Sequence, residues 1–122
     1  MSARRPLRRL TGHGAFDAVL RAGRRMEGLY LQIIVAPAPD TGGRSGFIIG
    51  RKVSPRAVDR NRIRRKLREV LRALPAAADR FDLVLRVTRG RTRVDQDAAT
   101  AEATRMLARL VAGEASFARG GR

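Results

Sequence analysis

A densely basic stretch constrains this chain more than any other feature, and it covers residues 54–74, SPRAVDRNRIRRKLREVLRAL. Apolar residues recur along it at positions 63, 67, 70, 71 and 74, which is the spacing of one helix face. The opposite face gathers Asn61, Arg64, Arg65, Arg68 and Arg72. Ser54 suits the N-cap and Pro55 the first helical position, while Pro75 marks the end. The pattern therefore predicts a helix with an apolar underside and an arginine-rich outer face.

The charge of this helix favours a polyanionic partner. Its only acids are Asp59 and Glu69, so its like charges at i, i+4 repel, whereas an ordinary solvated surface helix mixes the two signs. The whole chain of 122 residues carries a formal net charge of +16 and has a sequence pI of about 12.0. A clustered basic face of this kind is typical of nucleic-acid binding, and a solvated helix is the alternative interpretation.

Length and composition indicate a single small domain with a modest core. We expect a flexible basic arm at 1–9, one RNA-binding domain at 10–113 and a disordered tail at 114–122. There is no cysteine, which excludes disulfides and thiolate metal sites. No apolar run approaches the ~18 residues of a membrane span, and the N-terminus does not read as a secretory signal. We therefore expect a cytoplasmic protein with no membrane partner.

The rest of the chain predicts a small α+β fold. A helix is expected at about 13–22, with Thr11 as its N-cap and Gly23 at positive φ just after it. Strands are expected at 29–35, 45–51 and 82–88, with a further short strand around 24–28 as an option, and a last helix at about 95–112. The first two of these strands are expected to pair as an antiparallel hairpin. The third is nearly continuous in apolar residues and is expected at the centre of the sheet.

The sequence offers no recognisable catalytic or metal-binding constellation. The acids are mostly isolated, whereas a metal-dependent nuclease needs several converging carboxylates or histidines. His13 is the only histidine, which excludes a histidine pair for acid–base cleavage of RNA within one chain. Phe16 and Tyr30 are the candidates for stacking on RNA bases, and for Phe16 a place in the core is an equally good interpretation. We therefore predict a nucleic-acid binder with no catalytic residue of its own.

The segment from Arg44 to Arg72 resembles the signature region of the protein subunit of bacterial ribonuclease P. The matching residues are Gly46, Phe47, Arg51, Lys52, Ala57, Val58, Arg60, Asn61, Arg62, Ile63, Arg64, Arg65, Arg68 and Glu69. The N-terminal RLTGHGAFDAVLRAG and the later FDLVLRV are also similar to motifs of that family. The resemblance thus covers nearly the whole chain outside its two tails.

The resemblance implies a fold and a function. The fold is a small αβββαβα sandwich with a mixed sheet of about four strands, in which the arginine helix forms an unusual left-handed βαβ crossover. The function is that of a ribonucleoprotein endoribonuclease, ribonuclease P, which removes the 5′ leader of precursor tRNA. The catalyst is the ribonuclease P RNA with Mg²⁺ ions, and the protein assists as one copy per RNA. The protein itself is expected to hold no cofactor or metal.

The resemblance also implies two sets of RNA-binding residues, carried over position by position. The set expected to bind the catalytic RNA is Arg51, Lys52, Arg60, Asn61, Arg62, Arg64, Arg65 and Arg68. The set expected to bind the single-stranded leader is Phe16, Leu20 and Tyr30. Position 20 departs from the family, because many members have a second phenylalanine there, and leucine weakens base stacking at this point.

Three alternative functions remain open from the sequence. A ribosomal or other structural RNA-binding protein shares the basic helix but has no role in cleavage. A helix-turn-helix DNA binder requires a short helix just before the basic one, where this chain predicts strands. A self-sufficient ribonuclease predicts cleavage of precursor tRNA without any added RNA.

Overall fold

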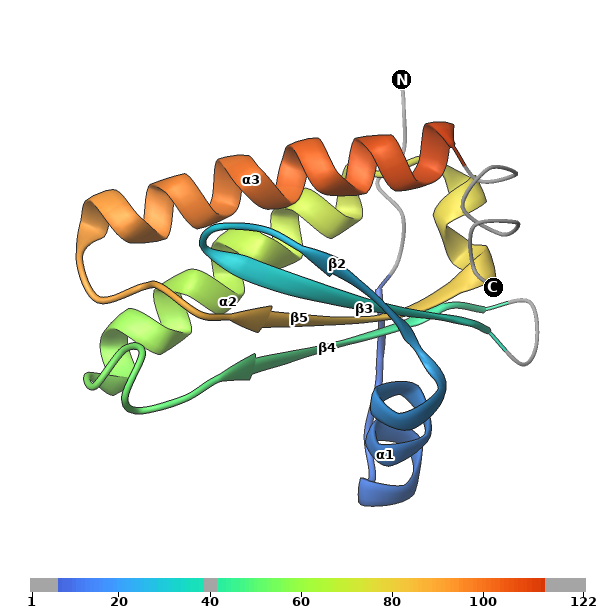
Figure 1. Ribbon diagram of the computed structural model, residues 1–122, viewed down its shortest axis with the longest axis horizontal. Coiled ribbons are helices and arrows are strands. Elements are labelled where there is room, and N and C mark those ends of the chain that lie inside the picture. Colours follow the sequence, from blue (N-terminus) through green and yellow to red (C-terminus); the bar gives the residue numbers. More distant parts are fainter. Residues whose placement is uncertain (1–6, 39–41, 114–122) are drawn as a thin grey trace.

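The computed structural model describes residues 7–38 and 42–113. The disordered tail expected at 114–122, and residues 1–6 of the flexible arm expected at 1–9, lie outside the described residues. The elements, in chain order, are β1 (Arg8–Arg9), α1 (His13–Ala22), β2 (Arg24–Glu27), β3 (Leu31–Pro37), β4 (Arg44–Ile49), α2 (Ala57–Arg72), the 3-10 helix η1 (Ala76–Arg80), β5 (Phe81–Val87) and α3 (Arg93–Ala112) (Figure 1). The predicted α+β class is confirmed.

The five strands form one mixed sheet in the order β1-β4-β5-β3-β2. β5 pairs antiparallel with β3 and parallel with β4, so the predicted hairpin between β3 and β4 is wrong. The reason lies in β5, where Leu83, Val84 and Leu85 are at most 1% exposed. A strand that is apolar on both faces is buried fully only at the centre of a sheet, as predicted for this one. Because β4 and β5 are parallel neighbours, α2 forms a crossover connection between them. The left-handed sense of this crossover stays a prediction.

Both edges of the sheet are short, charged strands. β2 pairs antiparallel with β3, and β1 pairs parallel with β4 through the partners Arg8↔Arg44 and Arg9↔Ser45. The sheet therefore has one strand more than the four or so that the resemblance implied. β1 was missed because two consecutive arginines carry no apolar alternation from which a strand could be predicted.

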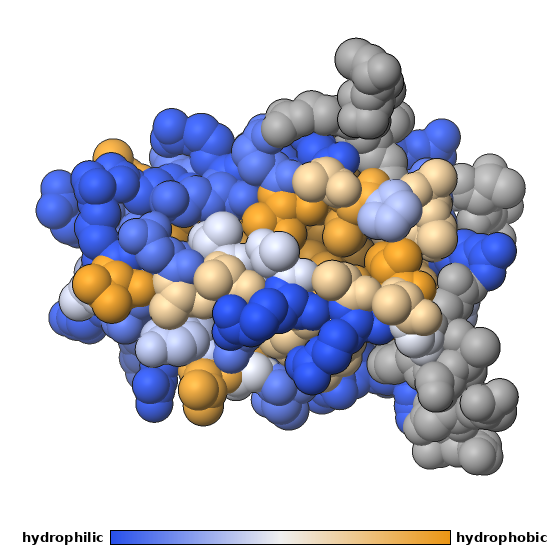
Figure 2. Space-filling view, turned by 90° about the horizontal axis from the view of Figure 1, so that it is seen from above, coloured by the Kyte–Doolittle hydropathy of each residue, from blue (hydrophilic) through white to orange (hydrophobic). Residues whose placement is uncertain are grey.

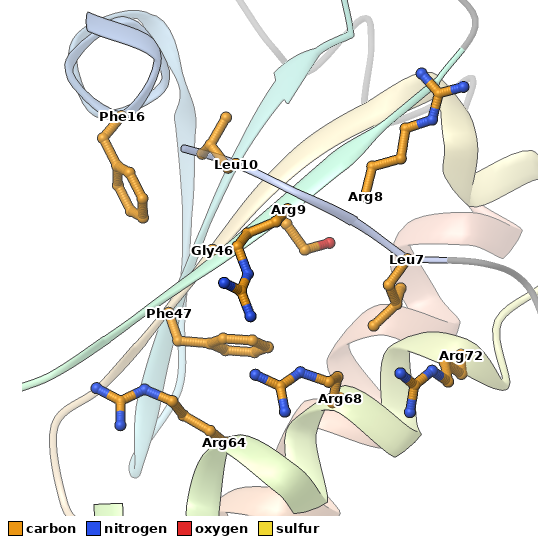
Figure 3. Close-up of a pocket in the computed structure, with 11 residues that line it drawn as sticks. Leu7, Arg8, Arg9, Leu10, Phe16, Gly46, Phe47, Arg64, Arg68 and Arg72 are labelled. Atoms are coloured by element: carbon orange, nitrogen blue, oxygen red, sulfur yellow. The ribbon is translucent and has the colours of Figure 1, made fainter. Parts of the chain in front are cut away.

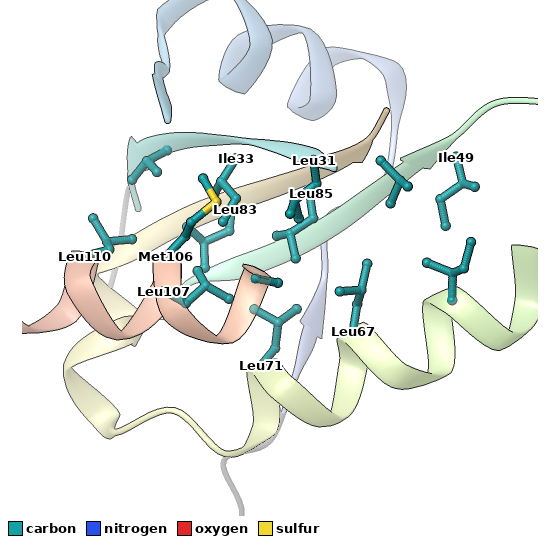
Figure 4. Close-up of a cluster of buried hydrophobic side chains, with 14 residues drawn as sticks. Leu31, Ile33, Ile49, Leu67, Leu71, Leu83, Leu85, Met106, Leu107 and Leu110 are labelled. Carbon is teal, nitrogen blue, oxygen red and sulfur yellow. The ribbon is translucent and has the colours of Figure 1, made fainter. Parts of the chain in front are cut away.

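The helices cover the two faces of the sheet unequally, with α2 and α3 side by side over one face and α1 alone against the other (Figure 1). The larger core lies under α2 and α3 (Figure 4) and contains Leu31, Ile33, Val35, Ile49, Ile63, Leu67, Leu71, Leu83, Leu85, Val87, Ala103, Met106, Leu107 and Leu110. A smaller core lies under α1 and contains Leu10, Val19, Ile34, Ala36 and Val84. The apolar stripe predicted for the arginine helix is confirmed, since Ile63, Leu67 and Leu71 are fully buried.

The helix starts differ from the predictions. α2 begins at Ala57 with Arg56 as its N-cap, so the predicted cap at Ser54 is wrong. The amide N–H groups of Val53 and Ser54 both donate to the carbonyl oxygen of Gly50, at 3.1 and 3.0 Å, and this turn buries Ser54 before the helix starts. α1 is capped by Gly12, with φ 87°, in place of Thr11.

Gly23 follows α1 as predicted, but for another reason. Its φ is −75°, so the expected left-handed conformation is wrong. A Cβ at this position would collide with the Ile34 side chain and would lie 2.5 Å from the Val19 carbonyl oxygen. Glycine is therefore required by the close approach of the chain to β3.

A buried carboxylate ties α3 to the turn before β3. Glu102 accepts the backbone N–H groups of Leu29, Tyr30 and Leu31 at 2.7, 2.8 and 3.1 Å. Leu29 and Tyr30 precede β3, which begins at Leu31, two residues later than predicted. A Cβ at Gly28 would lie 2.5 Å from the same carboxylate, so the turn needs glycine there. In the described part of the chain, no helix is long and apolar enough to cross a membrane.

Candidate nucleic-acid interface

The arginines of α2 lie on two flanks of the helix. Arg64, Arg68 and Arg72, spaced four residues apart, line a pocket beside β1 and β4, and we call this the pocket flank. Arg62 and Arg65 line a separate hollow on the side toward α3, and we call this the α3 flank. The two flanks differ in their neighbours, because the hollow also contains Lys66 and Glu69, and Lys66 Nζ lies 3.2 Å from Asp97 of α3.

Several residues of the predicted catalytic-RNA set make contacts within the protein. Arg60 Nη1 donates to the carbonyl oxygens of Ser54 and Pro55 at 2.9 and 2.8 Å, so this guanidinium braces the turn that leads into α2. Asn61 Oδ1 accepts from Arg64 Nη1 at 3.2 Å and thereby orients the first arginine of the pocket flank. Arg51 and Lys52 are exposed in the turn that precedes the helix.

The pocket beside β1 has a volume of about 430 Å³, and we call it the junction pocket (Figure 3). β1, α1, β4 and α2 all contribute to its walls. Its lining residues are Leu7, Arg8, Arg9, Leu10, Phe16, Ser45, Gly46, Phe47, Arg64, Arg68 and Arg72. None of these is acidic, so the junction pocket combines arginine with aromatic and aliphatic side chains and is electropositive.

Both aromatic rings of the junction pocket are held in place by particular neighbours. The guanidinium carbon of Arg68 lies 5.9 Å from the centre of the Phe47 ring, within the range of a cation–π contact. The Phe16 ring lies against the backbone of Gly46, where a Cβ would collide with it. Phe16 is half-buried, so it belongs in part to the smaller core and in part to the pocket wall.

The structure brings together two of the three residues predicted for the leader. Phe16 and Leu20 both pack against the smaller core under α1. Tyr30 lies apart, in the turn before β3, where its carbonyl oxygen accepts the Thr88 N–H at 2.8 Å. Arg89 places its guanidinium carbon 5.7 Å from the centre of the Tyr30 ring.

The face of the sheet between these sites carries residues that sequence reasoning missed. Gln32 pairs with Arg86 of β5, and Arg86 pairs with Ile48 of β4, so the three lie in a row across the sheet. By strand alternation they share the face of Ile34, which α1 covers, and Arg86 is exposed. The polar positions within β3 and β5 were the available signal, and pairing them required the strand order.

A second, largely apolar groove lies between α2 and α3 and has a volume of about 780 Å³. Figure 2 shows apolar side chains on this side of the molecule with hydrophilic ones around them. Val70, Leu74 and Val111 contribute to the groove, so Val111, expected in the buried stripe of the last helix, is only half-buried. No arginine of the described residues lines the groove, so its lining differs from that of the junction pocket.

The buried acids Asp82 and Glu102 both accept hydrogen bonds from within the protein. The Asp82 carboxylate accepts from the Arg44 side chain at 2.7 Å and from its backbone N–H at 2.9 Å. Within residues 7–38 and 42–113, no group of three or more histidine, cysteine or acidic side chains could hold a metal ion. The guanidinium groups and aromatic rings of this surface are suited to phosphate binding and to stacking.

Comparison with known proteins identifies consistent relatives. The family model described as Ribonuclease P matches residues 5–111. The chain is 44% identical over 70 residues to the ribonuclease P protein component of Synechococcus sp. (strain JA-2-3B'a(2-13)), covering 54% of this chain and 53% of that protein. It is 43% identical over 88 residues to that of Acidothermus cellulolyticus, covering 57% of this chain and 72% of that protein. The chain thus spans about half to three quarters of the length of these relatives.

Solved structures show the same fold at lower sequence identity. The RNase P protein of Staphylococcus aureus superimposes with a TM-score of 0.67 at 17% identity, covering 87% of this chain and 94% of that one. The RNase P protein from Thermotoga maritima gives a TM-score of 0.63 at 21% identity, covering 88% and 96%.

Proposed function

The chain belongs to the ribonuclease P protein family, and on that basis we propose that it is the protein subunit of a ribonucleoprotein endoribonuclease that removes the 5′ leader of precursor tRNA. The observation that carries this proposal is the family's signature segment folded as a helix with two arginine-bearing flanks. The proposed partners are the ribonuclease P RNA, one copy of it for each protein, and precursor tRNA. Because these RNAs are processed in the bacterial cytoplasm, we propose that the protein functions there.

The proposed surface for the catalytic RNA is α2 and the turn before it. Arg64 and Arg68 on the pocket flank, with Arg62 and Arg65 on the α3 flank, supply guanidinium groups suited to phosphate oxygens. Arg51, Lys52 and Asn61 extend this surface toward the start of the helix. Arg60 serves it indirectly in our proposal, because its guanidinium already holds the turn that sets the helix start.

The proposed surface for the leader is the face of the sheet next to α1. Phe16 and Leu20 form one end of it and Tyr30 lies toward the other, on the assumption that strand alternation continues one residue beyond β3. Gln32 and Arg86 lie between them and offer hydrogen bonds to a nucleotide strand. A single-stranded leader needs stacking surfaces and phosphate contacts rather than a groove that reads a duplex.

Catalysis in this proposal belongs to the RNA. The described side chains do not form a cluster fit for Mg²⁺, so we assign the ions required by the holoenzyme to the RNA subunit. Mg²⁺ held by the RNA would supply the activation of water and the stabilisation of charge on phosphate oxygens that hydrolysis requires. The protein neutralises charge between two RNA molecules and positions the leader, and both contributions strengthen substrate binding.

Reconstitution tests the proposed function. The full chain is added to its cognate ribonuclease P RNA, and cleavage of precursor tRNA is measured at low Mg²⁺ concentration. We expect no cleavage by the protein alone and a large gain when the protein joins the RNA. A protein that binds the RNA without changing leader removal would be a structural RNA-binding protein, and cleavage by the protein alone would identify a self-sufficient nuclease.

A matched pair of variants shows whether α2 carries the effect. The double variant Arg64→Ala/Arg68→Ala should weaken binding to the catalytic RNA and reduce the slope of log K against log salt by about 1 for each phosphate that an arginine no longer neutralises. The control, Arg105→Ala/Arg109→Ala, removes two exposed arginines from α3 and the same net charge. Equal weakening in the two double variants would show that net charge, and not the α2 surface, governs binding.

A further inference from the structure

We propose that the junction pocket binds one unpaired nucleotide of RNA, with the base against its aromatic and aliphatic walls and the phosphate on its arginines. This proposal rests on the proposed function, in that it requires the chain to bind RNA. It adds a defined site between two surfaces that the family resemblance treats separately. A nucleotide here would touch Phe16 of the leader surface and Arg68 of the catalytic-RNA surface at once.

Three arginines of the junction pocket are available for a phosphate. Arg72 is paired with Glu69 at 2.9 Å, but Arg9, Arg64 and Arg68 make no ion pair with any acid that the structure describes. Figure 3 shows Arg9 and Arg68 directed toward the space beside Phe47, while Arg8 points away from it. Such a concentration of guanidinium groups without a carboxylate is stabilised by an anion, and the planar guanidinium binds phosphate through two parallel hydrogen bonds.

The other walls of the junction pocket fit a base. Phe16 and Phe47 approach it from opposite faces of the sheet, and Leu7 and Leu10 of the β1 segment add aliphatic surface. The guanidinium of Arg68, already over the Phe47 ring, offers a second flat surface for stacking. The volume of about 430 Å³ lies within the ~300–1,000 Å³ typical of small-molecule sites. A site for phosphate alone would have no use for these apolar walls.

The wall formed by β1 is part of the folded protein. β1 pairs with β4, the Leu10 N–H donates to the Ser45 carbonyl oxygen at 2.9 Å, and Leu10 is 2% exposed in the smaller core. Alternation along this short strand directs Arg8 and Arg9 to opposite sides, and Arg9 points to the space beside Phe47. A wall that is ordered before the ligand arrives reduces the entropic cost of binding.

Binding of short RNA to the full chain tests the proposal. The probes are a fluorescent single-stranded RNA pentanucleotide and the same pentanucleotide with an abasic central position, which keeps every phosphate. We expect the intact probe to bind about tenfold more tightly, since stacking of one base typically accounts for a factor of this size. Equal affinity for the two probes would overturn the proposal in favour of a site for phosphate alone, as would equal competition against both by inorganic phosphate.

Variants place the effect in the junction pocket. Arg9→Gln and Arg68→Gln should each weaken binding of both probes severalfold. Arg109→Gln, at an exposed position of α3, should have a much smaller effect. Phe47→Leu, which keeps an apolar side chain on β4, should remove most of the difference between the probes. Equal effects of Arg9→Gln, Arg68→Gln and Arg109→Gln would place the nucleotide elsewhere. Arg9 contributes to the pocket from an exposed position, so its variant remains informative even if Phe47→Leu fails to fold.

Crosslinking in the reconstituted holoenzyme identifies the source of the nucleotide. Benzoylphenylalanine is placed at Leu7, in the pocket wall, and either the precursor tRNA or the catalytic RNA is labelled. A crosslink to a single-stranded position of either RNA supports the proposal and names its source, and a crosslink to neither contradicts it. If leader cleavage is restored by the protein while the pentanucleotide experiments fail, the pocket proposal falls and the proposed function stands.

Discussion

The two faces of the sheet differ in how much apolar surface they bury. Under α2 and α3 the core contains 14 buried residues, and Lys66 and Asp97 connect the two helices above it. Under α1 the core contains five buried residues among those that the structure describes, and Arg86, farther along the same face, is exposed. The first face supplies most of the hydrophobic stabilisation, because that stabilisation grows with the apolar area removed from water. The second leaves side chains available for a ligand.

The difference explains how one small chain can tolerate so much positive charge. Six of its 25 arginines lie on α2, whose apolar side is anchored in the larger core by Ile63, Leu67 and Leu71. The helix can therefore carry mutually repelling groups on its outer side without separating from the sheet. Recognition and stability are divided between the two sides of one helix, and again between the two faces of the sheet.

The largest expected effect comes from truncating the larger core. Leu67→Ala should lower the free energy of unfolding by about 2–5 kcal/mol, because it removes a fully buried side chain and leaves a cavity. Leu20→Ala, in a half-buried position on α1, should cost less than about 1.5 kcal/mol. Urea denaturation of both variants in sulfate buffer measures the difference. Equal destabilisation of the two variants would contradict the division of labour between the two faces.

A smaller loss is expected at the carboxylate that ties α3 to the sheet. Glu102→Gln replaces one of two accepting oxygens by an amide group that donates, so at least one of the three backbone N–H groups loses its partner. The expected cost is about 1–3 kcal/mol. Glu27→Gln is the control, since Glu27 is exposed and accepts a hydrogen bond from the Gln32 side chain, and its cost should stay within about 0.5 kcal/mol. Thermal unfolding followed by circular dichroism compares the two variants. Similar melting temperatures would show that the Glu102 carboxylate contributes little to stability.

The smallest expected effect is stabilisation by a simple anion. Sulfate that binds only the folded chain should add about 1.4 kcal/mol at ten times its dissociation constant. Arg64→Gln/Arg68→Gln should lose part of this gain, and Arg105→Gln/Arg109→Gln should keep it. Melting temperatures in sodium sulfate and in sodium chloride at matched ionic strength give the comparison. Equal melting temperatures in the two salts would show that the guanidinium groups of the folded chain do not bind sulfate.

Local features of the fold could be predicted, and pairings between distant segments could not. The apolar spacing of the arginine helix and the buried character of β5 are properties of adjacent residues, and both predictions were confirmed. The hairpin between β3 and β4 was wrong because the simplest pairing joins neighbours in sequence, whereas β5 enters between them. The cap at Ser54 was wrong because the preceding turn, closed onto Gly50, uses its backbone and buries it.

In the candidate site, too, residues within one segment could be predicted, and contacts between distant segments could not. The signature residues of α2 could be assigned from their resemblance to a family. The junction pocket could not, because its walls come from four elements and one of them, β1, has no periodicity in sequence. Arg60 illustrates the limit within a motif, since its place in the signature does not reveal that its guanidinium binds backbone carbonyls of its own chain.

The charged edge strands have a consequence for the protein before it meets RNA. An exposed sheet edge is a template on which another copy can add a strand, and this is a common route to aggregation. Here one edge is the two-residue β1, made of Arg8 and Arg9, and the other is β2, which starts with Arg24 and Arg25. A copy approaching either edge would bring like charges together in a short, polar pairing. The arginines that favour RNA thus also disfavour fibre-like association between free copies.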